Sequence, residues 1–241
     1  MFSMYGQNGM GSGAPSRERI ETSRNLITQI VHKLKMDYSV GSVDPSMKVA
    51  ERILRLFEEM QSKRMSVRYI LDEAGKIISQ YLKIREVIIG LKSPKDGKYR
   101  YEVFIGMRKN SEVAYKKLEY NYDDFLENEK WKHYKISKFT EIFFAEDEPF
   151  VPGEEAVYNR PMLLNLKRDS VDQSVEGDYI ESFMIGLDNE MVGWIEISGT
   201  KDNKLPSAST IKWIELIAQI LAVYVQCERA GAYRRLSAKS G

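Results

Sequence analysis

Apolar residues recur at three- and four-residue intervals in several parts of the chain, the spacing of helices that bury one face. This spacing predicts helices over residues 17–36, 66–81 and 211–226. A further helix is expected to begin at Asp44-Pro45, because aspartate can cap a first turn and proline can occupy its first position. Two helices therefore precede the segment that carries the remaining elements.

Between the helices, apolar runs bounded by turn residues predict strands. Residues 87–91 and 99–106 flank a turn with Asp96-Gly97 and are expected to form a hairpin. Residues 179–187 and 192–198 are expected to form a second hairpin around a polar turn. The other short elements expected are strands at 136–144 and 162–166 and helices at 111–118 and 122–130.

The order helix, hairpin, irregular middle, hairpin, helix predicts an α+β fold. Its central antiparallel β-sheet would carry the first and last helices on one face. We expect a disordered tail at 1–16, which is rich in glycine and polar residues, and a helical extension at 17–62. The main domain is expected at 63–230, followed by a flexible C-terminal tail at 231–241.

Composition narrows the class of protein. The chain has 241 residues, with 36 Lys and Arg against 35 Asp and Glu, so net charge favours neither nucleic acid nor an anionic membrane as a partner. Its single cysteine, Cys227, excludes an intramolecular disulfide. No apolar run appears long enough to span a bilayer, and no secretion signal is visible. We therefore expect a soluble, cytoplasmic protein without a membrane partner.

The sequence contains no recognisable catalytic or metal-binding pattern. Its two histidines, His32 and His133, have no cysteine or histidine neighbours at metal-ligand spacing and no recognisable nucleophile as a partner. Five carboxylates lie between Glu146 and Glu155, where they could hold a hard cation, but a solvated acidic loop is the favoured interpretation. We expect no metal and no catalytic residue, and no cofactor is indicated.

The end of the predicted domain resembles a GAF domain, the ligand-binding sensor fold of signalling proteins, with some likeness to PAS domains as well. The resemblance rests on an apolar strand with an early glycine, a short polar loop with a helix start, and an apolar helix. These are Val192-Gly193-Trp194-Ile195-Glu196-Ile197, Leu205-Pro206-Ser207 and Ile214-Glu215-Leu216-Ile217-Ala218. The resemblance implies a ligand pocket on the sheet face beneath the irregular middle segment. The cyclic-nucleotide motif of the family is absent between Ser198 and Thr210, and Cys227 matches no bilin-attachment position.

Four residues are candidates for ligand binding: Tyr101, Arg108, Tyr158 and Arg160. Arg160 stands among aromatic and amide groups, where it could bind a carboxylate or phosphate through two hydrogen bonds. A salt bridge from Arg160 to the neighbouring acidic loop is the competing interpretation. Tyr101 could line a site for a planar ligand, or serve ordinary core packing.

The last predicted helix carries two apolar stripes. One stripe can cover the sheet, and the other needs a partner, either the helices at 17–60 or a second subunit. Because GAF-like proteins commonly dimerise here, we expect a helical homodimer. The second stripe consists of Trp213, Leu216, Ile220, Val223, Tyr224 and Cys227.

These features favour a non-catalytic module in signalling, which senses a small molecule or binds a protein and acts through a separate output protein. One alternative is a transcription regulator with a GAF-like effector domain, although residues 17–62 lack a compact helix-turn-helix. Another is an unrecognised enzyme that uses Glu141 or Glu196 as a general acid or base.

Overall fold

The computed structural model describes residues 17–39, 44–62, 65–126, 132–147, 153 and 155–231. The chain divides into two compact units, residues 1–44 and 45–241. The described part of the first unit is helix α1 (Arg17–Ser39), which extends the helix predicted over 17–36. The tail predicted at 1–16 lies outside the described residues, as does nearly all of the tail predicted at 231–241.

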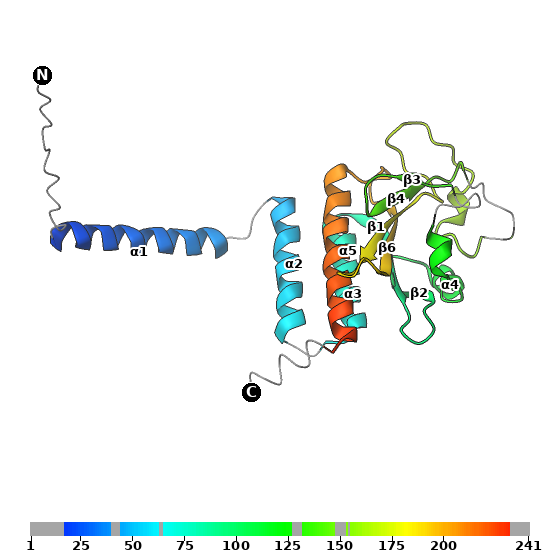
Figure 1. The fold of residues 1–241 in the computed structure, drawn as a ribbon. Helices are drawn as coiled ribbons and strands as arrows, with labels where there is room; N and C mark the ends of the chain where they lie inside the picture. The colour runs from blue at the N-terminus through cyan, green and yellow to red at the C-terminus, as the bar shows by residue number, and fades with distance from the viewer. Residues whose placement is uncertain are drawn as a thin grey trace, which may run out of the picture. The chain divides into compact units, whose positions relative to one another are not determined.

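The second unit is built on one six-stranded antiparallel sheet with the strand order β2-β1-β6-β5-β4-β3 (Figure 1). Both predicted hairpins are present, as the pairs β1–β2 and β5–β6. Strands β1 and β6 also pair with each other, so the two hairpins join at the centre of the sheet. The strands are β1 (Ile84–Lys92), β2 (Tyr99–Ile105), β3 (Tyr134–Lys135), β4 (Thr140–Phe143), β5 (Tyr179–Ile185) and β6 (Met191–Thr200).

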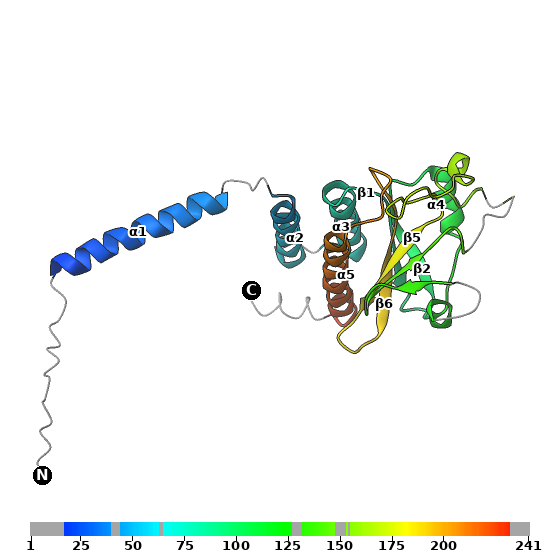
Figure 2. The same cartoon turned by 90° about the horizontal axis from the view of Figure 1, so that it is seen from above.

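Helices α3 (Val67–Tyr81) and α5 (Ala208–Arg229) cover one face of this sheet, whereas α4 (Lys109–Tyr115) lies on the other (Figure 2). The short 3-10 helices are η1 (Tyr122–Phe125) and η2 (Pro161–Leu163). Serines cap both long helices: Ser66 Oγ accepts from Tyr69 N at 3.2 Å, and Ser207 Oγ accepts from Thr210 N at 3.1 Å. The predicted α+β class, with the first and last helices of the domain on one face, is confirmed.

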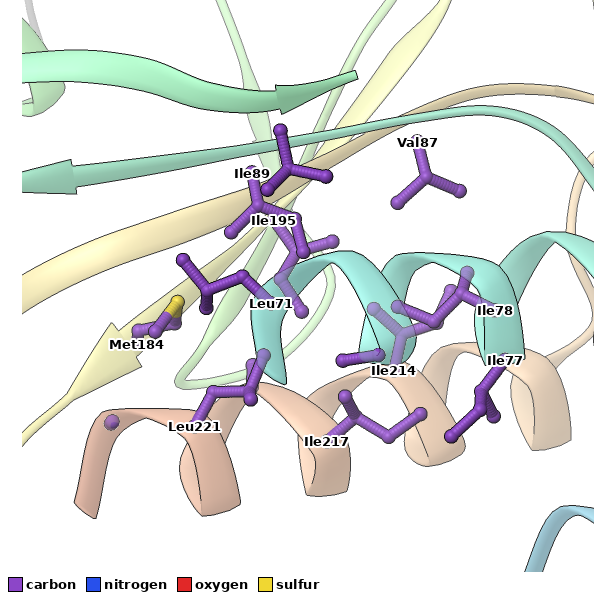
Figure 3. Close-up of a cluster of buried hydrophobic side chains, with 14 of the residues drawn as sticks. Leu71, Ile77, Ile78, Val87, Ile89, Met184, Ile195, Ile214, Ile217 and Leu221 are labelled. Atoms are coloured by element: carbon purple, nitrogen blue, oxygen red, sulfur yellow. The ribbon is translucent and has the colours of Figure 1, made fainter. Parts of the chain in front are cut away.

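The main hydrophobic core lies between the sheet and helices α3 and α5. Figure 3 shows Leu71 of α3 between the strands and Leu221 of α5, with Ile78 of α3 near Ile77 at the other end of the view. Leu71, Ile78 and Leu221 are fully buried, and so is Ile195 of β6. The core therefore fixes α3 and α5 to the central strands and leaves the opposite face of the sheet for other contacts.

Helix α2 (Pro45–Ser62) belongs to the same compact unit as the sheet. It begins where Asp44-Pro45 predicted and buries its apolar face against α3. The unit thus starts at Pro45, whereas the sequence placed α2 in an extension that ended at residue 62. The buried residues of α2 are Val49, Ile53, Leu56 and Met60.

Helix α5 is apolar enough, by length and composition alone, to cross a membrane, with a mean hydropathy of 1.4. No such run was expected from the sequence. Within this domain, α5 packs on β5, β6 and α3. These contacts bury 39% of the apolar window of α5.

Two predicted strands were wrong in detail. Residues 162–166 form no strand; Pro161 fixes the backbone for the short helix η2, in which Leu163 N donates to Arg160 O at 2.8 Å. The strand predicted over 136–144 is present only in its second half, as β4, which pairs with β3 across a turn at 136–139. Ser137 Oγ accepts from Phe139 N at 3.0 Å and stabilises a turn inside the predicted strand.

A register shift in the first hairpin changes which face Tyr101 occupies. Ile89 pairs with Val103, but the next residue, Gly90, pairs with Tyr101, so Glu102 is the extra residue of a bulge. Strict alternation would place Tyr101 and Val103 on the same face. The bulge instead puts Val103 in the helix-side core and Tyr101 among the aromatic residues of the other face.

Gly90 offers a test of this packing. A Cβ built on Gly90 would lie 2.1 Å from Cη2 of Trp194, whose ring is fully buried, so the ring would have to move. We expect Gly90→Ala to lower the free energy of unfolding by more than about 2 kcal/mol in urea denaturation.

Gly75→Ala is the matched control. Its new methyl would come closest to Cγ1 of the flexible Ile105 side chain, at 3.0 Å, with Val103 Cγ1 at an ordinary contact distance of 3.7 Å, and alanine favours the helical conformation of α3. This variant should stay within about 1 kcal/mol of the parent protein. If Gly90→Ala and Gly75→Ala lowered the free energy of unfolding equally, close packing of the Trp194 ring against Gly90 would be contradicted.

Candidate functional site

The sheet face opposite α3 and α5 carries a second, mainly aromatic cluster, which we call the aromatic cluster. Trp194 lies at its centre, with the ring of Tyr101 at 4.9 Å and that of Phe125 at 5.0 Å between centroids. Residues from α4, η1 and the loop between them close over it. Its members are Ile88, Tyr99, Tyr101, Phe104, Met107, Tyr115, Leu118, Tyr120, Phe125, Phe183, Ile185, Met191 and Trp194.

Three glutamates form a straight row across the same face, which we call the glutamate row. Glu181 of β5 pairs with Glu196 of β6 on one side and with Glu141 of β4 on the other. All three are buried. Residues directly opposite each other in antiparallel strands have Cβ atoms about 5 Å apart, a separation at which like charges are destabilising.

The outer members of the row have partners within the chain. Glu196 Oε2 accepts a hydrogen bond from the Tyr101 hydroxyl at 2.6 Å. Glu141 Oε2 lies 3.4 Å from Nε2 of His133. The central Glu181 is 9% exposed, and among the described residues it meets no hydrogen-bond donor or cation. The chain therefore leaves the middle carboxylate of the row uncompensated.

Burial and mutual repulsion shift the titration of the row. Burial, followed by the charges of Glu196 and Glu141, raises the pKa of Glu181 well above its usual value. Burial likewise raises the pKa of Glu196 to about 7, against the lowering effect of the Tyr101 hydrogen bond. The row therefore binds protons at a pH where ordinary surface glutamates are ionised.

Asn159 joins the irregular middle segment to Glu86 of β1, which lies outside the glutamate row. Its Nδ2 donates to Glu86 Oε1 at 2.9 Å, and its Oδ1 accepts from Arg108 N at 2.5 Å. Burial raises the pKa of Glu86 to about 7, although the Asn159 hydrogen bond opposes this shift. One amide thus fixes the segment around residue 159 to β1 and to the end of β2.

A pair of arginines lies beside Gly199 at the end of the central strands. Arg160 donates from its backbone N and from Nε to the carboxylate of Glu176, at 2.7 and 2.8 Å. Arg85 Nη2 donates to Thr200 O and to Asn203 Oδ1, both at 2.7 Å. Desolvation and then the charge of Arg160 lower the pKa of Arg85. The two guanidinium groups are close enough to repel each other.

The four predicted ligand-binding residues do not converge on one point. Tyr101 contacts the glutamate row, whereas Arg160 is held by Glu176, which is not part of the acidic loop at 146–155. Arg108 bonds Ser111 Oγ at 3.0 Å and the carbonyl of Glu155, and Tyr158 O accepts from Ser111 Oγ at 2.9 Å. Their role in ligand binding stays a prediction.

The predicted interface stripe of α5 is only partly accessible. Leu216 is 47% exposed, whereas Tyr224 is buried and its hydroxyl donates to Met65 O at 3.4 Å. Tyr224 therefore packs inside the chain. The remaining members, Trp213, Ile220, Val223 and Cys227, are half-buried.

Sequence reasoning missed Glu181 and Glu86 and mentioned Glu141 and Glu196 only as possible acids or bases. The available signal was a carboxylate between apolar neighbours in a strand, as in Tyr-Ile-Glu-Ser-Phe around Glu181. No group of three His, Cys, Asp or Glu side chains in the described residues is arranged to hold a metal ion.

Comparison with known proteins gives similarity in structure only. No family model matches the chain, and no curated protein matches it. The GAF domain of a phosphoenolpyruvate-protein phosphotransferase from Acinetobacter is 14% identical, with a TM-score of 0.47, over 76% of this chain and 95% of that one.

Two further solved structures have similar values. The GAF domain/HD domain protein from Geobacter sulfurreducens is 13% identical, with a TM-score of 0.47, over 70% of this chain and 97% of that one. The GAF domain of a putative sensor histidine kinase from Pseudomonas syringae pv. tomato is 12% identical, with a TM-score of 0.42, over 80% of this chain and 96% of that one. GAF domains are thus among the similar structures, as the sequence resemblance predicted, but similarity at this level carries no information about ligand or partner.

The raised pKa values predict how stability depends on pH. A carboxyl whose pKa is higher in the folded state binds more protons there than in the unfolded chain, so the free energy of unfolding falls as pH rises from about 4.5 to about 7. Glu181→Gln should flatten this fall and make the protein more stable than its parent at pH 8, with little difference at pH 4.

Urea denaturation across this pH range measures the effect. Glu102→Gln is the control, because Glu102 lies on β2 with 42% of its side chain exposed, and its pH profile should follow that of the parent. If the Glu181→Gln variant is less stable than the parent at pH 8, the Glu181 carboxyl must have a stabilising partner, and the account of an unpartnered row is wrong.

Proposed function

We propose that this protein is a non-catalytic module in signalling that senses a small molecule and acts as a helical homodimer. The observation that supports this proposal is the difference between the two faces of the sheet. One face is packed by apolar helices, and the other buries carboxylates without a full set of partners. Buried polar groups that lack partners are uncommon outside functional sites.

Strand β6 supplies a physical route from one face to the other. Glu196 lies in the glutamate row, while its neighbours Ile195 and Ile197 pack in the helix-side core. The strand leads through a short turn into α5. A ligand that shifts β6 would therefore bias the position of α5, and through it the binding of an output protein.

Helix α1 supports association with a second copy. Ile27, Val31, Leu34 and Tyr38 are exposed and follow one another at intervals of four, three and four residues, the spacing of a two-helix seam. Such a stripe is self-complementary when two copies lie side by side. Leu216 on α5 adds a second exposed apolar position.

Native mass spectrometry of the purified full-length chain tests the function. We expect a mass of two chains, with a small molecule retained on part of the population. A monomer that retains no molecule, and whose stability is unchanged by a library of metabolites, would contradict the proposal.

Substitutions in the apolar stripes test the dimer. Leu34→Lys on α1 and Leu216→Arg on α5 should each weaken association at least tenfold in sedimentation velocity, because each places a charge in an apolar contact. Leu187→Arg is the control, since Leu187 is 80% exposed in the turn between β5 and β6. A parent protein that is monomeric at micromolar concentration would contradict the dimer.

A further inference from the structure

The glutamate row holds three buried carboxyl groups on adjacent strands and gives the central one no partner among the described residues. The carboxylate of Glu181 faces carboxylates on both neighbouring strands, Glu141 and Glu196. It is nine-tenths buried and, among the described residues, has no donor within hydrogen-bond distance. Leaving such a group without a partner costs free energy that a bound cation can recover.

The arginines nearest to this region have partners of their own. Arg160 is held by Glu176, and Arg85 Nη2 by Thr200 and Asn203, whereas Arg85 Nη1 is buried without a hydrogen bond to a described residue. His133 lies at the outer end of the row, beside Glu141. None of the described basic side chains is placed to act on Glu181, whose electrostatic neighbours are the other two glutamates. A cation for Glu181 must therefore come from outside the described part of the chain.

Aromatic side chains form walls on both sides of the row. On one side Trp194 pairs with Phe183 across β6 and β5. On the other side Phe143 and Tyr179 stack with their ring centroids 4.3 Å apart. Aromatic faces attract cations and also pack against apolar groups, so these walls suit a molecule with a charged head and an apolar body.

A buried indole donor lies next to the glutamate row. The Nε1 of Trp194, within the aromatic cluster, is fully buried; it forms no hydrogen bond of good geometry with a described residue, but its interaction with the Glu196 carboxyl lowers the pKa of that group. Trp194 precedes Glu196 by two positions along β6 and shares its face of the sheet. The carboxyl of Glu181 and the indole N–H of Trp194 therefore lie in neighbouring rows of one surface.

We propose that the glutamate row binds a primary amine with an apolar body, with its ammonium group at Glu181 between Glu141 and Glu196. A primary ammonium has three N–H donors and no acceptor, which matches a surface of carboxylate oxygens. The ion neutralises the central carboxylate, and the aromatic walls contact the apolar body. This inference rests on the proposed ligand-binding function and names the ligand class of that site.

Calorimetric titration of the full-length protein with 2-phenylethylamine at pH 8 tests the inference. The neutral isostere 2-phenylethanol and the anion 3-phenylpropionate are the matched ligands. We expect the amine to bind at least tenfold more tightly than either. Binding should also weaken as pH falls, because protons on Glu181 and Glu196 compete with the ammonium.

Glu181→Gln should weaken amine binding at least tenfold while the protein stays folded by circular dichroism. Glu102→Gln should bind as the parent does. If Glu181→Gln fails to fold, Glu141→Gln replaces it, with the same expected direction. Equal binding of amine and alcohol, tighter binding of the anion, or unchanged binding by a folded Glu181→Gln would each overturn the inference.

Failure of this inference can be distinguished from failure of the proposed function. If native mass spectrometry finds a retained molecule that is not an amine, and 2-phenylethylamine does not bind, the ligand class is wrong but the sensing function stands. If no molecule is retained and none of the three probes binds, both are wrong.

Discussion

The burial of three neighbouring carboxylates on one face of a sheet is the constraint on which the domain depends. Glu141, Glu181 and Glu196 repel one another, and the chain supplies partners only to the outer two. Because burying these carboxyl groups lowers the stability of the domain, a large apolar core elsewhere is needed to keep it folded. The helix-side core supplies it, with fully buried side chains from α3, α5 and the central strands.

The two faces are tied together by the alternation of β6. Because successive side chains of a strand point to opposite faces, the residues that hold α5 and the residue that joins the glutamate row are direct neighbours in sequence. Gly90 allows the Trp194 ring to lie directly on β1, which brings the aromatic cluster close to the central strands. The fold therefore couples charge on one face to helix packing on the other.

The sequence predicted the elements whose apolar residues recur at a regular spacing along the chain. Helices α1, α2, α3 and α5 and both long hairpins followed from spacing and turn residues. It failed where non-local contacts decide the structure. The turn at Ser137, where the hydroxyls of Ser137 and Thr140 donate to Glu215 of α5, split a predicted strand, and the bulge at Glu102 moved Tyr101 to the other face. The glutamate row was missed for the same reason, since its members come from three strands and meet only through register.

A nuclear magnetic resonance titration of the glutamate side-chain carboxyls tests the central claim most directly. Carboxyl carbon shifts recorded from pH 3 to 9, with assignments from Glu181→Gln and Glu196→Gln, report the pKa of each group in the folded protein. We expect Glu196 to titrate near pH 7 and Glu181 to titrate well above the usual range of a glutamate. Titration of both groups near their ordinary value of 4.5 would contradict the account.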